Sequence, residues 1–106
     1  MTYRVVLTAR AERDRDVAFD WYAENYSREF AAHWYSGLTR TIRSLREDPL
    51  RCSIAHENDK FSFELREVLF GGRRHKHRIL FTPQGDQVLV LHIRHSAQRD
   101  LTEEDL

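Results

Sequence analysis

The sequence predicts an α+β fold: one small domain in which a hairpin of two helices packs on one face of a mainly antiparallel, twisted sheet. The length of 106 residues fits one domain with a single core. Two consecutive segments near the N-terminus have the apolar spacing of amphipathic helices. Three later segments alternate apolar and polar residues, as strands do. With a short strand at the start, the predicted order over residues 1–106 is β-α-α-β-β-β.

The first strand is predicted at residues 3–7, and Thr8 is a suitable N-cap for the helix that follows. That helix is expected over residues 9–25, where apolar side chains recur at steps of three and four. Ser27 is a suitable cap for a second helix, which Pro49 should end. The apolar stripe of the second helix consists of Phe30, Trp34, Leu38, Ile42 and Leu45.

Three further strands are predicted over residues 61–66, 75–81 and 88–95. Turn residues at 71–74 and 83–86 make both connections short, so the three strands should be antiparallel neighbours. The last ten residues, 97–106, are expected to form a mobile tail.

Residues of equal parity in a strand share a face, which predicts an apolar and a basic face for this sheet. In the last strand, Leu89, Leu91 and Ile93 are assigned to the apolar face. A basic face opposite the core is suited to bind anions such as phosphate. It would carry Arg66, Lys76, Arg78, His92 and Arg94.

The formal net charge is zero, but the charges are segregated along the chain. Residues 61–99 hold seven basic and three acidic side chains, whereas residues 100–106 hold four acidic and no basic ones. The basic surplus therefore coincides with the predicted sheet.

A single cysteine, Cys52, rules out an internal disulfide and favours a reducing compartment. No apolar stretch approaches membrane-spanning length, and no secretory signal is recognisable at residues 1–10. We therefore predict a cytoplasmic protein without membrane partners. No metal or other cofactor is predicted, because His92 and His95 lie on different faces and no cysteine or carboxylate completes a ligand set.

Several motifs, in their order and spacing, resemble the RelE/ParE superfamily of toxins from type II toxin–antitoxin systems. The resemblance covers residues 3–99 and implies a small growth-inhibiting toxin of the kind found in plasmid stabilization systems. It also implies a cognate antitoxin protein that wraps the toxin and blocks its active face. The motifs are the opening Tyr-Arg-Val-Val-Leu-Thr, Leu-Arg-Glu-Val-Leu at 65–69, His-Arg-Ile-Leu-Phe at 77–81 and Val-Leu-Val-Leu-x-Ile-x-His at 88–95.

Members of the RelE type are metal-independent mRNA interferases, which cut mRNA on the ribosome. By motif position, the resemblance assigns Arg78 to their functional strand arginine, His95 to a terminal-strand histidine and Glu57 to a loop glutamate. Cleavage by 2′-hydroxyl attack needs a base, an acid and cations for the phosphate. The candidate catalytic residues are Arg78, His95, Arg66 and Glu57, and the candidate RNA-binding residues are Lys76, His92, Arg94 and Arg99.

Other hypotheses remain open at this point. Many RelE-type nucleases use a tyrosine near the C-terminus, but all four tyrosines of this chain lie at or before Tyr35. Members of the ParE type instead poison DNA gyrase without chemistry of their own. A third hypothesis is an inactive member that only binds its antitoxin. Simple structural roles also compete: Arg66 could pair with Glu64 or Glu67, and His95 could be a core residue at the strand end.

Overall fold

The computed structural model describes residues 2–106, and over these residues the predicted order β-α-α-β-β-β is confirmed, with one additional short strand. Neither of its two helices is long and apolar enough to cross a membrane. The elements are β1 (Arg4–Leu7), α1 (Ala9–Asn25), α2 (Arg28–Ser44), β2 (Ser53–Ile54), β3 (Arg66–Phe70), β4 (His77–Gln84) and β5 (Gln87–His95), with 3-10 turns at Pro49–Arg51, Asn58–Lys60 and Glu103–Asp105.

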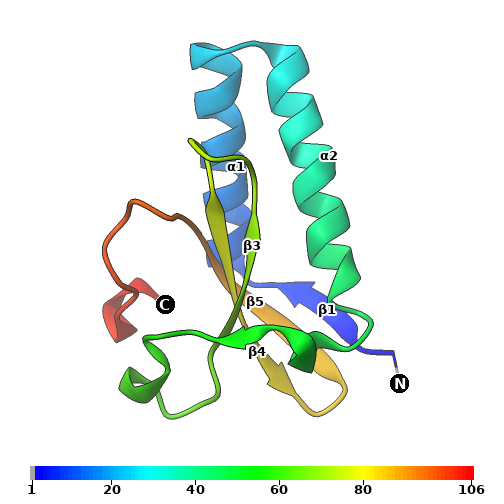
Figure 1. The fold of residues 1–106 in the computed structure, drawn as a ribbon, viewed down its shortest axis with the longest axis vertical. Helices are drawn as coiled ribbons and strands as arrows, with labels where there is room; N and C mark the ends of the chain where they lie inside the picture. Colours follow the sequence, from blue (N-terminus) through cyan, green and yellow to red (C-terminus); the bar gives the residue numbers. More distant parts are fainter. Residues whose placement is uncertain (1) are drawn as a thin grey trace.

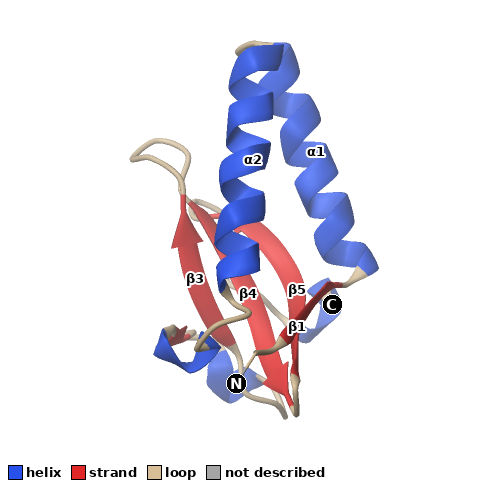
Figure 2. Cartoon of the chain, turned by 90° about the vertical axis from the view of Figure 1, so that its right-hand side faces the viewer, coloured by secondary structure: helices blue, strands red, loops and turns tan. Residues whose placement is uncertain are grey.

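The strands form one mixed sheet in the order β1-β5-β4-β3-β2. Strand β1 runs parallel to β5, and the other neighbours are antiparallel. The hairpin of α1 and α2 covers one face of this sheet (Figure 2), which we call the helix face. The opposite face, here called the outer face, carries the turn at Asn58–Lys60 and the C-terminal segment (Figure 1).

Both predicted helix caps are confirmed. The Thr8 hydroxyl accepts a hydrogen bond from the N–H of Ala11 at 3.2 Å, and the Ser27 hydroxyl accepts one from Phe30 at 3.0 Å. Helix α2 ends at Ser44, earlier than Pro49 requires. The next backbone N–H groups bond to carbonyls three residues back, which tightens the helix into a turn that tucks Leu45 into the core.

The main core lies between the helix hairpin and the helix face. Trp34 and Leu38 of α2 pack there with Ile79 and Phe81 of β4. The predicted stripe of α2 is thus buried, except for Phe30 at its start, which is exposed. The close approach of α2 to β3 depends on Gly37, since a Cβ atom there would lie 2.8 Å from the ring of Phe70.

A β-bulge in the last strand changes the predicted faces. Leu80 pairs with His92 but Phe81 pairs with Val90, which leaves Leu91 without a partner in the ladder. The alternation of faces therefore shifts at this point, and Val90 joins Ile93 in the main core. The prediction that Leu89 and Leu91 face the helices is wrong for this reason.

The predicted strand at residues 61–66 is also wrong, because the strand begins only at Arg66. The preceding segment crosses the outer face, where Leu65 is fully buried in a second, smaller core with Ala55, Leu80 and Leu101. The Leu65 N–H donates to the Asn58 side chain at 2.7 Å instead of joining a strand ladder. The alternating apolar residues of this segment thus report burial on that core rather than strand pairing.

Candidate functional site

The sheet register places Arg78 and Arg94 directly opposite each other on the outer face. His92, two residues before Arg94 in β5, lies on the same face. This part of the predicted basic face is confirmed. Arg66 does not belong to it, because it pairs with Phe81 and therefore lies on the helix face. The guanidinium of Arg66 donates to Glu64 at 2.6 Å and to the Cys52 carbonyl at 2.6 Å, which is the simple structural pairing. The predicted common face for Arg66 is wrong.

Arg78 is enclosed by two carboxylates. Its guanidinium donates to both oxygens of Glu57, at 2.6 and 2.8 Å, and to Glu67 Oε1, at 2.6 and 3.0 Å. Glu57 is fully buried and also accepts the N–H of Leu101 at 2.9 Å. Burial alone would raise the pKa of Glu57, but the hydrogen bonds from Arg78 and Leu101 outweigh it and lower the pKa to about 2. The Glu57 carboxylate therefore serves here as a counter-ion, with both oxygens occupied.

Arg94 and His92 are also buried, although Arg94 Nε has no hydrogen-bond partner within residues 2–106. The Arg94 guanidinium donates to the Arg99 carbonyl at 2.8 Å, and burial lowers its pKa. The Nδ1 atom of His92 lies 2.7 Å from Asp14 Oδ2, in ion-pair range but outside hydrogen-bond geometry. Asp14 comes from α1 and also accepts the N–H of Ile93, beyond the part of β5 that β1 covers. Arg78, His92 and Arg94 are only 8, 1 and 3 % exposed.

The C-terminal segment covers Arg78, His92 and Arg94, which together we call the basic cluster. Leu101 is buried in the second core, and Asp105 binds the Arg99 guanidinium with both oxygens, at 2.8 and 2.9 Å. Residues 97–106, predicted as a mobile tail, thus make specific contacts with the outer face. Of the other predicted RNA-binding residues, Arg99 is exposed but paired with Asp105. Lys76, half-buried just before β4, forms no ion pair within residues 2–106.

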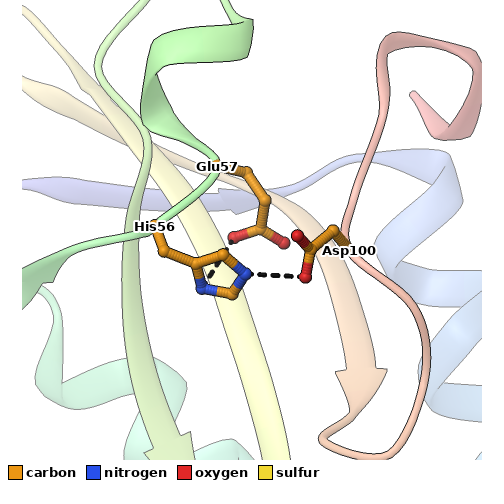
Figure 3. Close-up of side chains that lie close together, drawn as sticks. All are labelled: His56, Glu57 and Asp100. Carbon is orange, nitrogen blue, oxygen red and sulfur yellow. Dashed lines mark hydrogen bonds and ion pairs between the residues drawn. The ribbon is translucent and has the colours of Figure 1, made fainter.

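A cluster of His56, Glu57 and Asp100 joins the loop before Asn58 to the C-terminal segment (Figure 3). The His56 Nε2 atom lies 2.7 Å from Asp100, and its Nδ1 atom lies 3.5 Å from Glu57. Three such groups could in principle hold a cation. However, Glu57 is already saturated by Arg78, and the Lys60 ammonium lies 3.8 Å from Asp100. The cluster is better explained as an imidazole bridge between two carboxylates that fastens the C-terminal segment.

His95 lies on the helix face, since it pairs with His77, whose side chain is in contact with the aromatic rings of α1 and α2. Both of its ring nitrogens are within reach of backbone groups: Nδ1 accepts from Ala97 at 3.1 Å, and Nε2 is 3.3 Å from the Arg74 carbonyl. It lines a cavity of about 620 Å³ between α1 and the ends of β4 and β5. Within that cavity, burial and then the charges of His95 and His75 lower the pKa of His77 to about 4.

The four predicted catalytic residues are therefore divided by the sheet. Glu57 and Arg78 lie together on the outer face, whereas Arg66 and His95 lie on the helix face. Their catalytic roles stay predictions, since the geometry brings only the first two into contact.

Sequence reasoning missed the residues that neutralise the basic cluster. Glu67 could have been found from strand parity had β3 been placed at Arg66–Phe70, because it pairs with Leu80 on the outer face. Asp14 and Asp105 carry no local signal, since they come from α1 and the C-terminal segment. Also missed were arginines at the β3–β4 connection, Arg73 and Arg74, which line a second cavity.

Three comparisons with known proteins bear on this arrangement. A family model described as the ParE toxin of type II toxin–antitoxin system, parDE, matches residues 5–100. A solved structure from P. aeruginosa, described as a chromosomal ParDE TA system, is similar with a TM-score of 0.71 and 16% sequence identity. The match covers 89% of this chain and 96% of that chain. At this low identity it shows that the two chains share a fold. No curated protein sequence matches the chain.

Proposed function

Because the chain belongs to the family of ParE toxins of type II toxin–antitoxin systems, we propose that it inhibits growth by binding DNA gyrase and has no nuclease activity. A toxin of such a system has an antitoxin as its partner. The proposed target is gyrase rather than ribosome-bound mRNA.

The observation that supports this choice is the burial of the basic cluster. An RNA phosphate would have to displace Glu57 and Glu67 from Arg78, and the C-terminal segment from Arg94. Breaking a buried ion pair costs about 3 to 5 kcal/mol when one charge is left without a partner. The sheet also separates His95 from Arg78. This separation argues against a nuclease, because acid–base catalysis requires both groups at one phosphate.

One specific observation keeps the RelE-like mRNA interferase as a second candidate. Glu57 and Arg78 are in direct contact at 2.6 Å, and a carboxylate beside a guanidinium is a combination that phosphodiester cleavage can use. That candidate requires the C-terminal segment to move away from the outer face.

The test separates DNA damage from loss of mRNA. We expect purified toxin to inhibit gyrase supercoiling, and induced cells to show DNA breaks while ribosome-bound transcripts stay intact. A variant with Glu57 and Arg78 both replaced by apolar residues, Glu57→Leu with Arg78→Met, should retain gyrase inhibition. Ribosome-dependent cuts in mRNA with normal gyrase activity would refute the proposal in favour of the nuclease.

A further inference from the structure

Three arginines that lack counter-ions lie beside α2, on the side of the sheet opposite the basic cluster. The connection between β3 and β4 projects beside the helix hairpin (Figures 1 and 2). A cavity of about 490 Å³ lies between its tip and α2. Three exposed arginines line it, Arg40 from α2 and Arg73 and Arg74 from the connection, with no carboxylate among the lining residues. Within residues 2–106, none of their guanidinium groups makes an ion pair or hydrogen bond.

One residue that lines this cavity also has a buried, unpaired donor. Trp34 lines it and is 6 % exposed, yet its Nε1–H has no hydrogen-bond partner within residues 2–106. Buried N–H groups nearly always have an acceptor, so this donor is free to bind an oxygen atom of a ligand in the cavity. The lining residues thus combine three guanidinium groups with a buried indole N–H, all of which are donors.

Phosphate fits this set of donors better than carboxylate does. A single guanidinium already satisfies both oxygens of a carboxylate, as Arg99 does for Asp105 in this chain. A phosphate diester in a strand repeats its charge at every nucleotide, so that neighbouring phosphates can bind separate arginines. The planar fork of arginine suits such contacts.

Exposed aromatic rings continue from the mouth of this cavity. Phe30 stacks on Tyr26 with ring centroids 4.8 Å apart, and Tyr26 lies 5.9 Å from Trp21. All three side chains are more than a third exposed, although large aromatic residues are normally buried. Rings beside a row of cations form the usual platform for unpaired bases of a nucleic acid strand.

We propose that this surface, formed by Arg40, Arg73, Arg74, Trp34 and the rings of Trp21, Tyr26 and Phe30, binds single-stranded DNA. The phosphates occupy the cavity of the three arginines, and the bases stack on the exposed rings. The choice of DNA rests on the proposed function, since gyrase acts on DNA. The toxin would then contact both the enzyme and the strand that the enzyme holds.

The test uses the full chain and a fluorescent single-stranded DNA oligonucleotide. Three phosphate contacts predict a slope of about −2 in a plot of log affinity against log salt, or roughly a 15-fold loss between about 50 and about 200 mM salt. The double variant Arg73→Ala with Arg74→Ala should bind at least about tenfold more weakly. Its matched control is Arg43→Ala with Arg46→Ala, which removes the same charge from exposed positions beside β1 and should bind as the parent does.

A second variant tests the indole donor. Trp34→Phe keeps an aromatic ring but removes the N–H, and it should weaken binding several-fold while the Arg43/Arg46 control stays unaffected. Thermal melting monitors the fold of every variant.

The remaining arms decide whether the ligand is DNA. RNA of the same sequence, inorganic phosphate and polyglutamate are compared with the DNA oligonucleotide. Stronger binding of RNA or of polyglutamate would overturn the proposal, as would equal binding by the Arg73/Arg74 variant. Gyrase inhibition without oligonucleotide binding would refute this inference alone. Oligonucleotide binding without gyrase inhibition would leave the DNA site in place and refute the proposed function.

Discussion

Replacing Arg78 by alanine should lower the free energy of unfolding more than a substitution at an exposed position does. The change removes three donors from two carboxylates and leaves the buried Glu57 with only the Leu101 N–H and, at 3.5 Å, the His56 imidazole. Removing one member of a buried ion pair costs about 3 to 5 kcal/mol. Domains of this size have a free energy of unfolding of about 5 to 15 kcal/mol, so the loss is a large fraction of the total.

Urea denaturation followed by circular dichroism measures this loss directly. We expect the free energy of unfolding to fall by about 3 kcal/mol or more in Arg78→Ala. In the matched control Arg73→Ala, whose guanidinium is exposed and unpaired, it should change by less than about 0.5 kcal/mol. The double variant Glu57→Leu with Arg78→Met should recover most of the loss, because it replaces the pair by apolar groups. A change below about 1 kcal/mol in Arg78→Ala would refute the inference that this ion pair is structural.

Three further predictions follow from the described contacts. The pKa of Glu57 lies below its value in the unfolded chain, so ionised Glu57 stabilises the fold by roughly 3 kcal/mol above about pH 4.5. This stabilisation is lost as the pH falls towards about 2. When the free energy of unfolding is measured against pH, Glu57→Gln should lack this acid-dependent loss. The pKa of His77 is also lowered, to about 4, so the unfolded state takes up a proton at a higher pH than the folded state does. The free energy of unfolding should therefore fall by roughly 2 kcal/mol between about pH 8 and pH 5. If His77→Asn shows the same fall over this pH range, the assignment to His77 is contradicted. Gly37→Ala should destabilise the fold by about 1 to 3 kcal/mol in a thermal melt, because its methyl group meets the Phe70 ring at 2.8 Å, whereas Gly72→Ala, which meets nothing within 4 Å, should have little effect.

The helices were predictable because their signals are local. Apolar residues at steps of three and four set the buried side of α2, and Thr8 and Ser27 cap N–H groups only three residues ahead. The end of α2 was less predictable. It depends on Leu45 reaching the core and on Asp48 adopting a positive φ of 48°, and both depend on tertiary contacts.

Sheet faces were predictable only within uninterrupted strands. Arg78 and Arg94 share a face as parity predicts, because no irregularity separates their pairs. The bulge beside Leu80 leaves no mark in the sequence, and it reverses the alternation for Leu89 and Leu91. Arg66 shows a different limit. Apolar and polar residues do alternate before Arg66, but the apolar ones pack on the second core together with the C-terminal segment. The alternation therefore did not indicate where the strand begins.

The exposure of the basic residues could not be read from the sequence, although the charge pattern contained a hint. A basic sheet followed by an acidic tail gives a net charge of zero, which is what internal neutralisation would require. Asp105 of that tail binds Arg99 and lies 4.0 Å from Arg94, while Asp100 lies 2.7 Å from His56.

The pairing of the cations also predicts where an anionic partner can bind. A cation buried with its counter-ion offers little to a ligand, because the ligand must replace contacts that already exist. The arginines at the β3–β4 connection, Arg73 and Arg74, are exposed and make no ion pair within residues 2–106, so an anion need not displace an existing partner there. We therefore propose that an anionic partner binds at the β3–β4 connection, where counter-charges are absent, rather than on the outer face, where the positive charges are already paired.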